Sequence, residues 1–254
     1  MNILVLIKQT FDTEEKIVIH DGQISEDGVE FILNPYDEYA VEEAVKIKEQ
    51  IGAEITVLTV GPARSESSLR TALAMGADKA IMIELEEEVD EYTVAKLITS
   101  AIKGSKYELI LGGNMAVDSG SGQVAIRVAE DLGMPHVSTV TKLSIDGAMA
   151  IIERDVEGDI EVIEVQLPFL ATAQQGLNEP RYPSLPGIMK AKKKPLERLS
   201  VTDLSLSDDD LAIRTSVRDQ YLPHKKQAGR VLEGVIPQQV SELVQLLRNE
   251  AKVV

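Results

Sequence analysis

The strongest constraint on this sequence is its alternation of short apolar runs with amphipathic segments. Apolar runs at residues 3–7, 54–60, 79–83 and 108–113 are each followed, directly or after an insertion, by apolar residues at the spacing of one helical face. Strands that alternate with helices of roughly 10 to 15 residues and short loops are typical of crossovers between parallel strands. We therefore expect an α/β fold with a doubly wound, mainly parallel sheet.

Two parts of the chain depart from this rhythm early. Residues 16–20 and 29–33 flank the turn pairs Asp21-Gly22 and Asp27-Gly28, which predicts a small hairpin excursion. Asn34-Pro35 then predicts the start of a helix, with Asn34 as the N-cap and Pro35 at the first helical position.

The rhythm changes again after Gly133. Extended segments between residues 137 and 173 predict antiparallel strands added to the sheet. A proline-rich stretch, 177–187, leads to a short predicted helix at 188–194. Residues 195–237 have no sustained period, so we expect them to be disordered or to form an arm on another protein. An amphipathic helix at 240–247 should dock on its own domain or on a partner. This divides the chain into an α/β domain, 1–194, and a C-terminal arm and helix, 195–254.

Composition excludes several classes of function. The 254 residues carry a net charge of -16, which disfavours nucleic-acid binding. There is no cysteine and there are three scattered histidines, so disulfides, thiolate catalysis and a transition-metal cluster are not expected. The first apolar run is too short to span a membrane, and no cleavage site follows it, so we expect no membrane insertion and a cytoplasmic location.

The loop from Gly113 to Gln123 is the main candidate for ligand binding. It joins a buried strand to a helix, where unpaired backbone N–H groups and the helix dipole favour a phosphate. It matches neither the dinucleotide fingerprint nor a Walker A loop. On pattern alone, a loop that merely packs helix on strand is about equally well supported. Serine hydroxyls at 119 and 121 and glycines at 120 and 122 favour a ligand, whereas Asp118 suits a helix cap better than an anion site.

No nucleophile with a partnering base is evident, and the carboxylates are dispersed. The lysines of residues 190–194 are either a solvated face or, beside Leu185-Pro186, half of an electrostatically steered docking site.

Several motifs point to one family. These are Ile3-Leu-Val-Leu-Ile-Lys8, Asn34-Pro-Tyr-Asp-Glu-Tyr-Ala-Val-Glu-Glu-Ala44, Arg70-Thr-Ala-Leu-Ala-Met-Gly-Ala77, Glu153-Arg-Asp-Val-Glu-Gly158 through Leu167-Pro168, and Leu177-Asn-Glu-Pro-Arg-Tyr182 to Lys194. They resemble, in order and over essentially the whole chain, the beta subunit of electron transfer flavoprotein of the bacterial type.

The resemblance implies a Rossmann-like fold of the adenine nucleotide alpha hydrolase type, in a heterodimer whose alpha subunit carries the redox FAD. The beta subunit would bind AMP, accept electrons from acyl-CoA dehydrogenases through that FAD and pass them to a quinone reductase, without an active site of its own. The arm after Pro195 would wrap the alpha subunit. The residues implied for the nucleotide are Leu6, Asn34, Pro35, Tyr36, Asp37, Val60, Gly113, Asn114, Met115, Ala116, Val117, Asp118, Ser119, Gly120, Ser121, Gly122, Gln123 and Val124. Those implied for dehydrogenase docking, with Leu185 as the anchor, are Leu185, Pro186, Ile188, Met189 and Lys190.

The nucleotide loop also departs from the family patterns. AMP-binding members tend to have Asn-Gln-Thr where this chain has Gly122-Gln-Val124, and electron-bifurcating members, with a second FAD here, tend to have Asp-Gly-Asp-Thr-Ala-Gln-Val-Gly-Pro at 118–126. The intact docking segment favours AMP and simple electron shuttling. The alternatives are a bifurcating complex that oxidises NADH, and a stand-alone nucleotide-binding domain.

Overall fold

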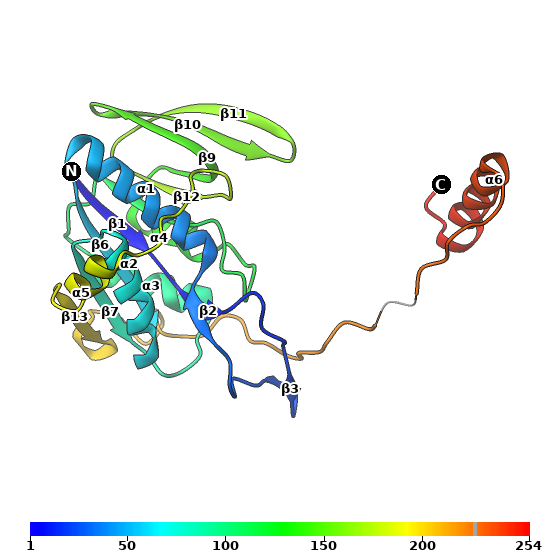
Figure 1. Cartoon of the computed structure of the whole chain (residues 1–254). Helices are drawn as coiled ribbons and strands as arrows, with labels where there is room; N and C mark the ends of the chain where they lie inside the picture. Colours follow the sequence, from blue (N-terminus) through cyan, green and yellow to red (C-terminus); the bar gives the residue numbers. More distant parts are fainter. Residues whose placement is uncertain (226–227) are drawn as a thin grey trace. The chain divides into compact units, whose positions relative to one another are not determined.

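The computed structural model describes residues 1–225 and 228–254 (Figure 1). The chain divides into two compact units. The first comprises residues 1–18 and 25–218, and the second comprises residues 19–24 and 219–254. A nine-stranded sheet forms the centre of the first unit. Its strands are β1 (Asn2–Leu6), β6 (Glu54–Gly61), β7 (Lys79–Glu84), β8 (Leu109–Gly113), β9 (His136–Asp146), β10 (Met149–Val156), β11 (Asp159–Gln166), β12 (Phe169–Ala173) and β13 (Leu196–Ser200).

The strand order is β11-β10-β9-β12-β8-β1-β6-β7-β13. In this order, every neighbouring pair from β9-β12 to β7-β13 is parallel. The two remaining pairs, β11-β10 and β10-β9, are antiparallel. The predicted fold class, a mainly parallel sheet with added antiparallel strands, is confirmed. The chain runs from β1 through β6 to β7 on one side and then returns to place β8 on the other side of β1, so the switch point lies between β1 and β8.

Helices cover both faces of the sheet. Helices α1 (Pro35–Ile51) and α2 (Glu66–Met75) pack on one face, and α3 (Glu91–Ala101) and α4 (Val124–Leu132) contribute to the core on the other. Side chains of β1 alternate between the two cores, since Ile3 and Val5 belong to the first and Leu4 and Leu6 to the second. This double coverage explains why the strands read as continuous apolar runs.

The early excursion differs in detail from the prediction. Instead of one hairpin between residues 16–20 and 29–33, β2 (Gln9–Phe11) pairs with β5 (Phe31–Leu33), and a separate short hairpin joins β3 (Ile19–His20) to β4 (Gln23–Ile24). Phe11 and Phe31 face each other edge to face with ring centroids 5.1 Å apart. This aromatic pair stabilises the pairing of β2 with β5.

The sheet continues past residue 194. Strand β13 pairs in parallel with β7 and forms one edge of the sheet, which the sequence analysis does not predict. Beyond it, a 3-10 turn η2 (Val201–Asp203) follows, and Leu199, Val201, Leu204, Leu206 and Leu211 pack against the core that contains α3 and α4. The first unit thus extends to Arg218. Contact between residues 195–254 and an alpha subunit stays a prediction.

The second unit contains helix α6 (Ile236–Leu246) and a π-helical turn η3 (Leu247–Ala251), which agrees with the predicted C-terminal helix. Its apolar residues Val240, Leu243 and Val244 are exposed. In the part of the chain that the structure describes, no helix combines the length and apolar character needed to cross a bilayer.

Candidate nucleotide and docking sites

The loop after β8 lies at the carboxyl edge of the sheet, beside the switch point. Its residues 117–120 are exposed, while Asn114, Met115 and Ala116 are half-buried. Helix α4 begins at Val124, and no side chain among the described residues caps its first turn at Gln123. Backbone N–H groups at the start of this helix can therefore meet an anion, as the sequence predicts for a phosphate site.

Asn34 is the N-cap residue of α1 and Pro35 is its first residue, as predicted, but the Asn34 side chain does not make the capping bond. Its side chain accepts no backbone N–H from the first turn of α1. Instead, Nδ2 donates to the Met115 carbonyl at 3.0 Å, and Oδ1 accepts from the Val117 N–H at 3.1 Å. Asn34 is completely buried. The amide thus ties the start of α1 to the nucleotide loop.

Asp37 makes the corresponding link one helical turn later. One carboxylate oxygen accepts from the Lys8 N–H at 2.6 Å, just after β1, and the other accepts from the Gly113 N–H at 3.0 Å, at the end of β8. Burial raises the pKa of Asp37 to about 7, against the opposing effect of N–H donors from Lys8 and Gly113 and of the Asn34 side chain. A buried carboxylate therefore spans the switch point.

Gly113 is required by this close packing. A Cβ at this position would touch Asp37 Oδ1 and would lie 2.7 Å from Tyr36 Cβ and 2.8 Å from the Tyr36 carbonyl carbon. Farther along the loop, Gly120 and Gly122 have φ angles of 65° and 61°, in the left-handed region that glycine enters without strain. Gly113 thus allows the strand end to pack closely against α1, and Gly120 and Gly122 allow the loop to turn.

Lys8 is a residue of this site that the sequence analysis does not select. Its Nζ lies 2.7 Å from a carboxylate oxygen of Asp118, so the ion pair links the end of β1 to the loop. Asp118 does not cap α4, contrary to the prediction, because Gln123 occupies the N-cap position and Asp118 pairs with Lys8 instead. The positive charge of Lys8 partly offsets the negative charge of Asp118 beside the loop. The position of Lys8, two residues past β1, is the signal that could have identified it.

The remaining predicted residues lie at the same edge of the sheet. Leu6 ends β1, and Val60 lies near the end of β6, which is the neighbour of β1 on the side away from β8. Asn114 is fixed from β12, because its N–H donates to the Ala173 carbonyl at 2.9 Å and its Oδ1 accepts from the Thr172 hydroxyl at 3.2 Å. The structure thus gathers the loop and the start of α1 closely, and places Val60 farther along the edge.

The predicted docking segment has an exposed tip. Helix α5 runs from Leu185 to Ala191, earlier than predicted, because the Ser184 hydroxyl caps it by accepting from the Gly187 N–H at 3.1 Å. Leu185 is 79% exposed and Met189 is 72% exposed. Large apolar side chains at this exposure are typical of contact surfaces, and Pro186, Ile188 and Lys190 lie beside them.

The base of the segment is fixed to α1. The Arg181 guanidinium binds both oxygens of Glu42, at 2.8 and 2.9 Å, and reaches Glu49 at 2.6 Å. Asn178 Nδ2 donates to Glu43 at 2.9 Å and to the Tyr39 carbonyl at 3.0 Å. Glu42 and Glu43 are buried. Glu42 and Glu43 lie within a predicted helix next to its apolar positions. Acidic residues at such positions indicate that basic or amide side chains from elsewhere in the chain pair with them.

The lysines do not act alike. Lys190, Lys192 and Lys193 are exposed, whereas Lys194 points inward and donates to the Leu73 carbonyl at 2.9 Å and the Ala77 carbonyl at 2.5 Å. Burial lowers the pKa of Lys194, because removing its ammonium from water disfavours the charged form. The run is thus neither wholly a solvated face nor wholly a docking surface.

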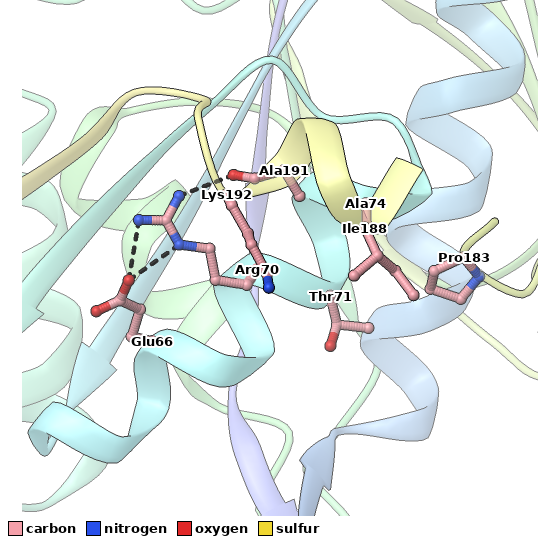
Figure 2. Close-up of a pocket in the computed structure, with 8 residues that line it drawn as sticks. All are labelled: Glu66, Arg70, Thr71, Ala74, Pro183, Ile188, Ala191 and Lys192. Carbon is pink, nitrogen blue, oxygen red and sulfur yellow. Dashed lines mark hydrogen bonds and ion pairs between the residues drawn. The ribbon is translucent and has the colours of Figure 1, made fainter. Parts of the chain in front are cut away.

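A hollow of about 460 Å³ lies between α2 and α5. Figure 2 shows its two ends: Arg70 binds Glu66 and the Ala191 carbonyl at one, and Ile188 and Pro183 lie at the other. Arg70 thereby fixes the end of α5 onto α2. The hollow adjoins the docking segment rather than the nucleotide loop.

Comparison with known proteins agrees with this arrangement. The sequence model of the electron transfer flavoprotein domain matches residues 21–204. The chain is 56% identical to the electron transfer flavoprotein subunit beta of Bacillus subtilis, over the full length of both chains. The chain belongs to the electron transfer flavoprotein beta subunit family.

Other relatives carry the same name. The electron transfer flavoprotein subunit beta of Syntrophomonas wolfei is 40% identical, with 100% of this chain and 98% of the relative covered. The human subunit is 35% identical, with 92% and 93% covered. Membership of this electron transfer flavoprotein family implies a role in electron transfer, an association with flavin and an alpha subunit as partner.

Proposed function

We propose that this electron transfer flavoprotein beta subunit binds AMP in the loop between β8 and α4 and supports an alpha subunit that carries FAD. In this function the heterodimer accepts electrons from acyl-CoA dehydrogenases and passes them to a quinone reductase. The FAD supplies the redox chemistry, and residues of the present chain hold the nucleotide and dock the donor. The observation that carries the proposal is the loop at the switch point, with an uncapped helix start beside it.

The residues present fit a nucleotide phosphate. Gly113 keeps the strand end free of a side chain, and Gly120 and Gly122 turn the backbone toward the start of α4. Because Gly122 and Val124 provide no side-chain donor, backbone N–H groups and the Ser121 hydroxyl supply the hydrogen bonds. This composition suits an anion better than an uncharged ligand.

The nucleotide assignment is tested by mass spectrometry of small molecules released from the denatured heterodimer. We expect one FAD and one AMP for each heterodimer. Two FAD would replace the proposal with the electron-bifurcating alternative, in which the second flavin occupies this loop and NADH is the donor. Release of FAD alone would contradict the AMP assignment.

The docking assignment rests on exposed Leu185 and on the exposed lysines beside it. A central apolar anchor with a charged rim is the usual arrangement of a contact that forms rapidly. Leu185→Ala in the heterodimer should slow reduction by a medium-chain acyl-CoA dehydrogenase by about tenfold or more, the effect of losing one anchor residue. FAD content should not change.

Ile160→Ala is the matched control, because Ile160 is an apolar residue of β11 that is 67% exposed. It should leave the rate of reduction at the wild-type value. Equal rates for wild type and Leu185→Ala would refute docking through this segment. Triple replacement of Lys190, Lys192 and Lys193 by glutamine should weaken the dependence of the rate on salt.

A further inference from the structure

Asn34 and Asp37 share an unusual property among the residues assigned to the nucleotide. Both side chains are buried, with exposures of 0% and 5%, and both are bonded to backbone groups of the loop or of the strand beside it. The Asn34 amide uses its nitrogen and its oxygen on the loop. Asp37 uses one oxygen on Lys8 and the other on Gly113.

These bonds join three parts of the site. Gly113 is held at the end of β8, and Met115 and Val117 are held at the first half of the loop. The Lys8 N–H is held at the end of β1. The loop path from Gly113 to Val117 is therefore set from α1, a helix that the sequence places far from it.

We propose that Asn34 and Asp37 are positioning residues, whose side chains fix the loop so that its later backbone N–H groups meet the nucleotide, without touching the nucleotide themselves. This inference rests on the proposed function of the loop. A preformed loop does not have to be ordered when the ligand binds, so its affinity is higher than that of a free loop. The burial of both side chains and the contact between Gly113 and Asp37 support the assignment.

A general contribution to stability is the competing explanation, and amide hydrogen exchange separates the two. In the heterodimer stripped of nucleotide, Asp37→Asn should speed exchange at the Gly113 and Lys8 amides by about tenfold or more, because one acceptor oxygen becomes a donor. Asn34→Leu should do the same at Val117. Asn34→Asp should preserve the Val117 bond and give a smaller change there.

Asp78→Asn is the matched control. Asp78 also accepts a backbone N–H, from Ile55 at 2.9 Å, and binds Lys48, but it precedes β7 and lies at the opposite edge of the sheet. It should lower the midpoint of thermal unfolding without altering exchange at Gly113 or Val117. It should also leave the dissociation constant of AMP unchanged, whereas Asp37→Asn and Asn34→Leu should raise it by about tenfold.

The outcomes separate this inference from the proposed function. If Asp37→Asn weakens AMP binding while loop exchange stays at the wild-type rate, Asp37 is a direct contact and the inference is wrong. If Asp78→Asn changes loop exchange as much as Asp37→Asn does, the effect is general destabilisation and the inference is again wrong. If the wild-type heterodimer does not bind AMP, the proposed function fails, and exchange in the nucleotide-free protein still decides whether these residues position the loop.

Discussion

Arg181 and Glu42 form a bidentate ion pair that holds the predicted docking segment against helix α1. Nε and Nη2 of the guanidinium lie 2.8 and 2.9 Å from the two carboxylate oxygens, and only 6% of the Glu42 side chain is exposed. Hydrogen bonds to Glu49 and Glu42 raise the pKa of Arg181, and the bond to Glu49 has the larger effect. The segment whose tip carries the exposed Leu185 is thus held at its base by a planar ion pair.

Removal of this pair should destabilise the protein. We expect Arg181→Ala to lower the free energy of unfolding by about 2 kcal/mol, because Glu42 would remain buried without its charged partner. Arg181→Lys should recover only part of the loss, since an ammonium cannot reproduce the planar contact. Urea denaturation measures both changes.

Arg154→Ala is the control for that measurement. Arg154 pairs with Glu161 at the surface, between strands β10 and β11, and its loss should cost less than about 1 kcal/mol. Equal losses for Arg181→Ala and Arg154→Ala would contradict a special role for the buried Glu42.

Gly113 gives a second prediction, about packing. Gly113→Ala should destabilise the protein by about 1–3 kcal/mol, because the new Cβ would collide with Asp37 and Tyr36. Gly112→Ala is a matched neighbour, since its Cβ would lie 3.6 Å from Leu6 Cβ, an ordinary contact. Thermal unfolding of the two variants should rank them clearly, and an equal shift would show that the strand end yields.

Asp37 gives a prediction of pH dependence. Its pKa is raised from 3.8 to about 7 in the folded state, so between pH 4 and 7 the folded protein keeps a proton that the unfolded chain has released. The contribution of Asp37 to the free energy of unfolding must therefore fall as pH rises through this window, by about 1.4 kcal/mol per pH unit at most, and level off above it.

Comparison with Asp37→Asn isolates this term, because other groups titrate equally in both proteins. Urea denaturation between pH 5 and 8 should show a wild-type curve that falls relative to the variant up to pH 7. A constant difference across that range would mean that Asp37 is already ionised at pH 5.

Asp90 gives a prediction for the segment after β13. One of its oxygens caps α3 by accepting from the Thr93 N–H at 3.0 Å, and the other accepts from the N–H groups of Arg214 and Thr215 at 2.7 and 2.8 Å. Burial would raise the pKa of Asp90, but these donors outweigh it and lower the pKa to about 2. The stabilisation is present above about pH 4 and is lost as pH falls from 4 toward 2.

Asp90→Asn should release the segment at neutral pH while an amide oxygen still caps α3. Trypsin should then cleave after Arg214 faster than in the wild type. Asp203→Asn, which alters only the local turn at Ser200, is the control and should leave this cleavage unchanged. Unchanged cleavage in Asp90→Asn would show that other contacts hold the segment.

The parallel sheet and the place of the loop could be predicted because their signals are local. Apolar runs and helical spacing in the first 132 residues reflect burial against one or two faces. The role of Asn34 could not be predicted in the same way. An asparagine before a helix has a nearby use as a cap, and only the return of the loop to α1 shows that its amide bonds elsewhere.

Strand β13 and the segment after it also lie beyond local patterns. The spacing of five apolar residues after residue 198 follows no single strand or helix period, because the backbone between them turns while it packs against the core. These residues are Leu199, Val201, Leu204, Leu206 and Leu211. Likewise, the sequence does not distinguish Lys194, which points inward, from the exposed lysines beside it. The acceptors of Lys194 lie at the end of α2, more than a hundred residues earlier in the chain.

The pairing of β13 with β7 has a consequence for biosynthesis. Ala80 of β7 pairs with Leu196 of β13. During translation, this edge of β7 therefore stays unpaired until the C-terminal part of the chain leaves the ribosome. Contacts between residues so far apart in sequence form slowly, and an uncovered strand edge promotes association with other chains. Until residue 200 emerges, this edge of β7 is therefore open to pairing with other chains.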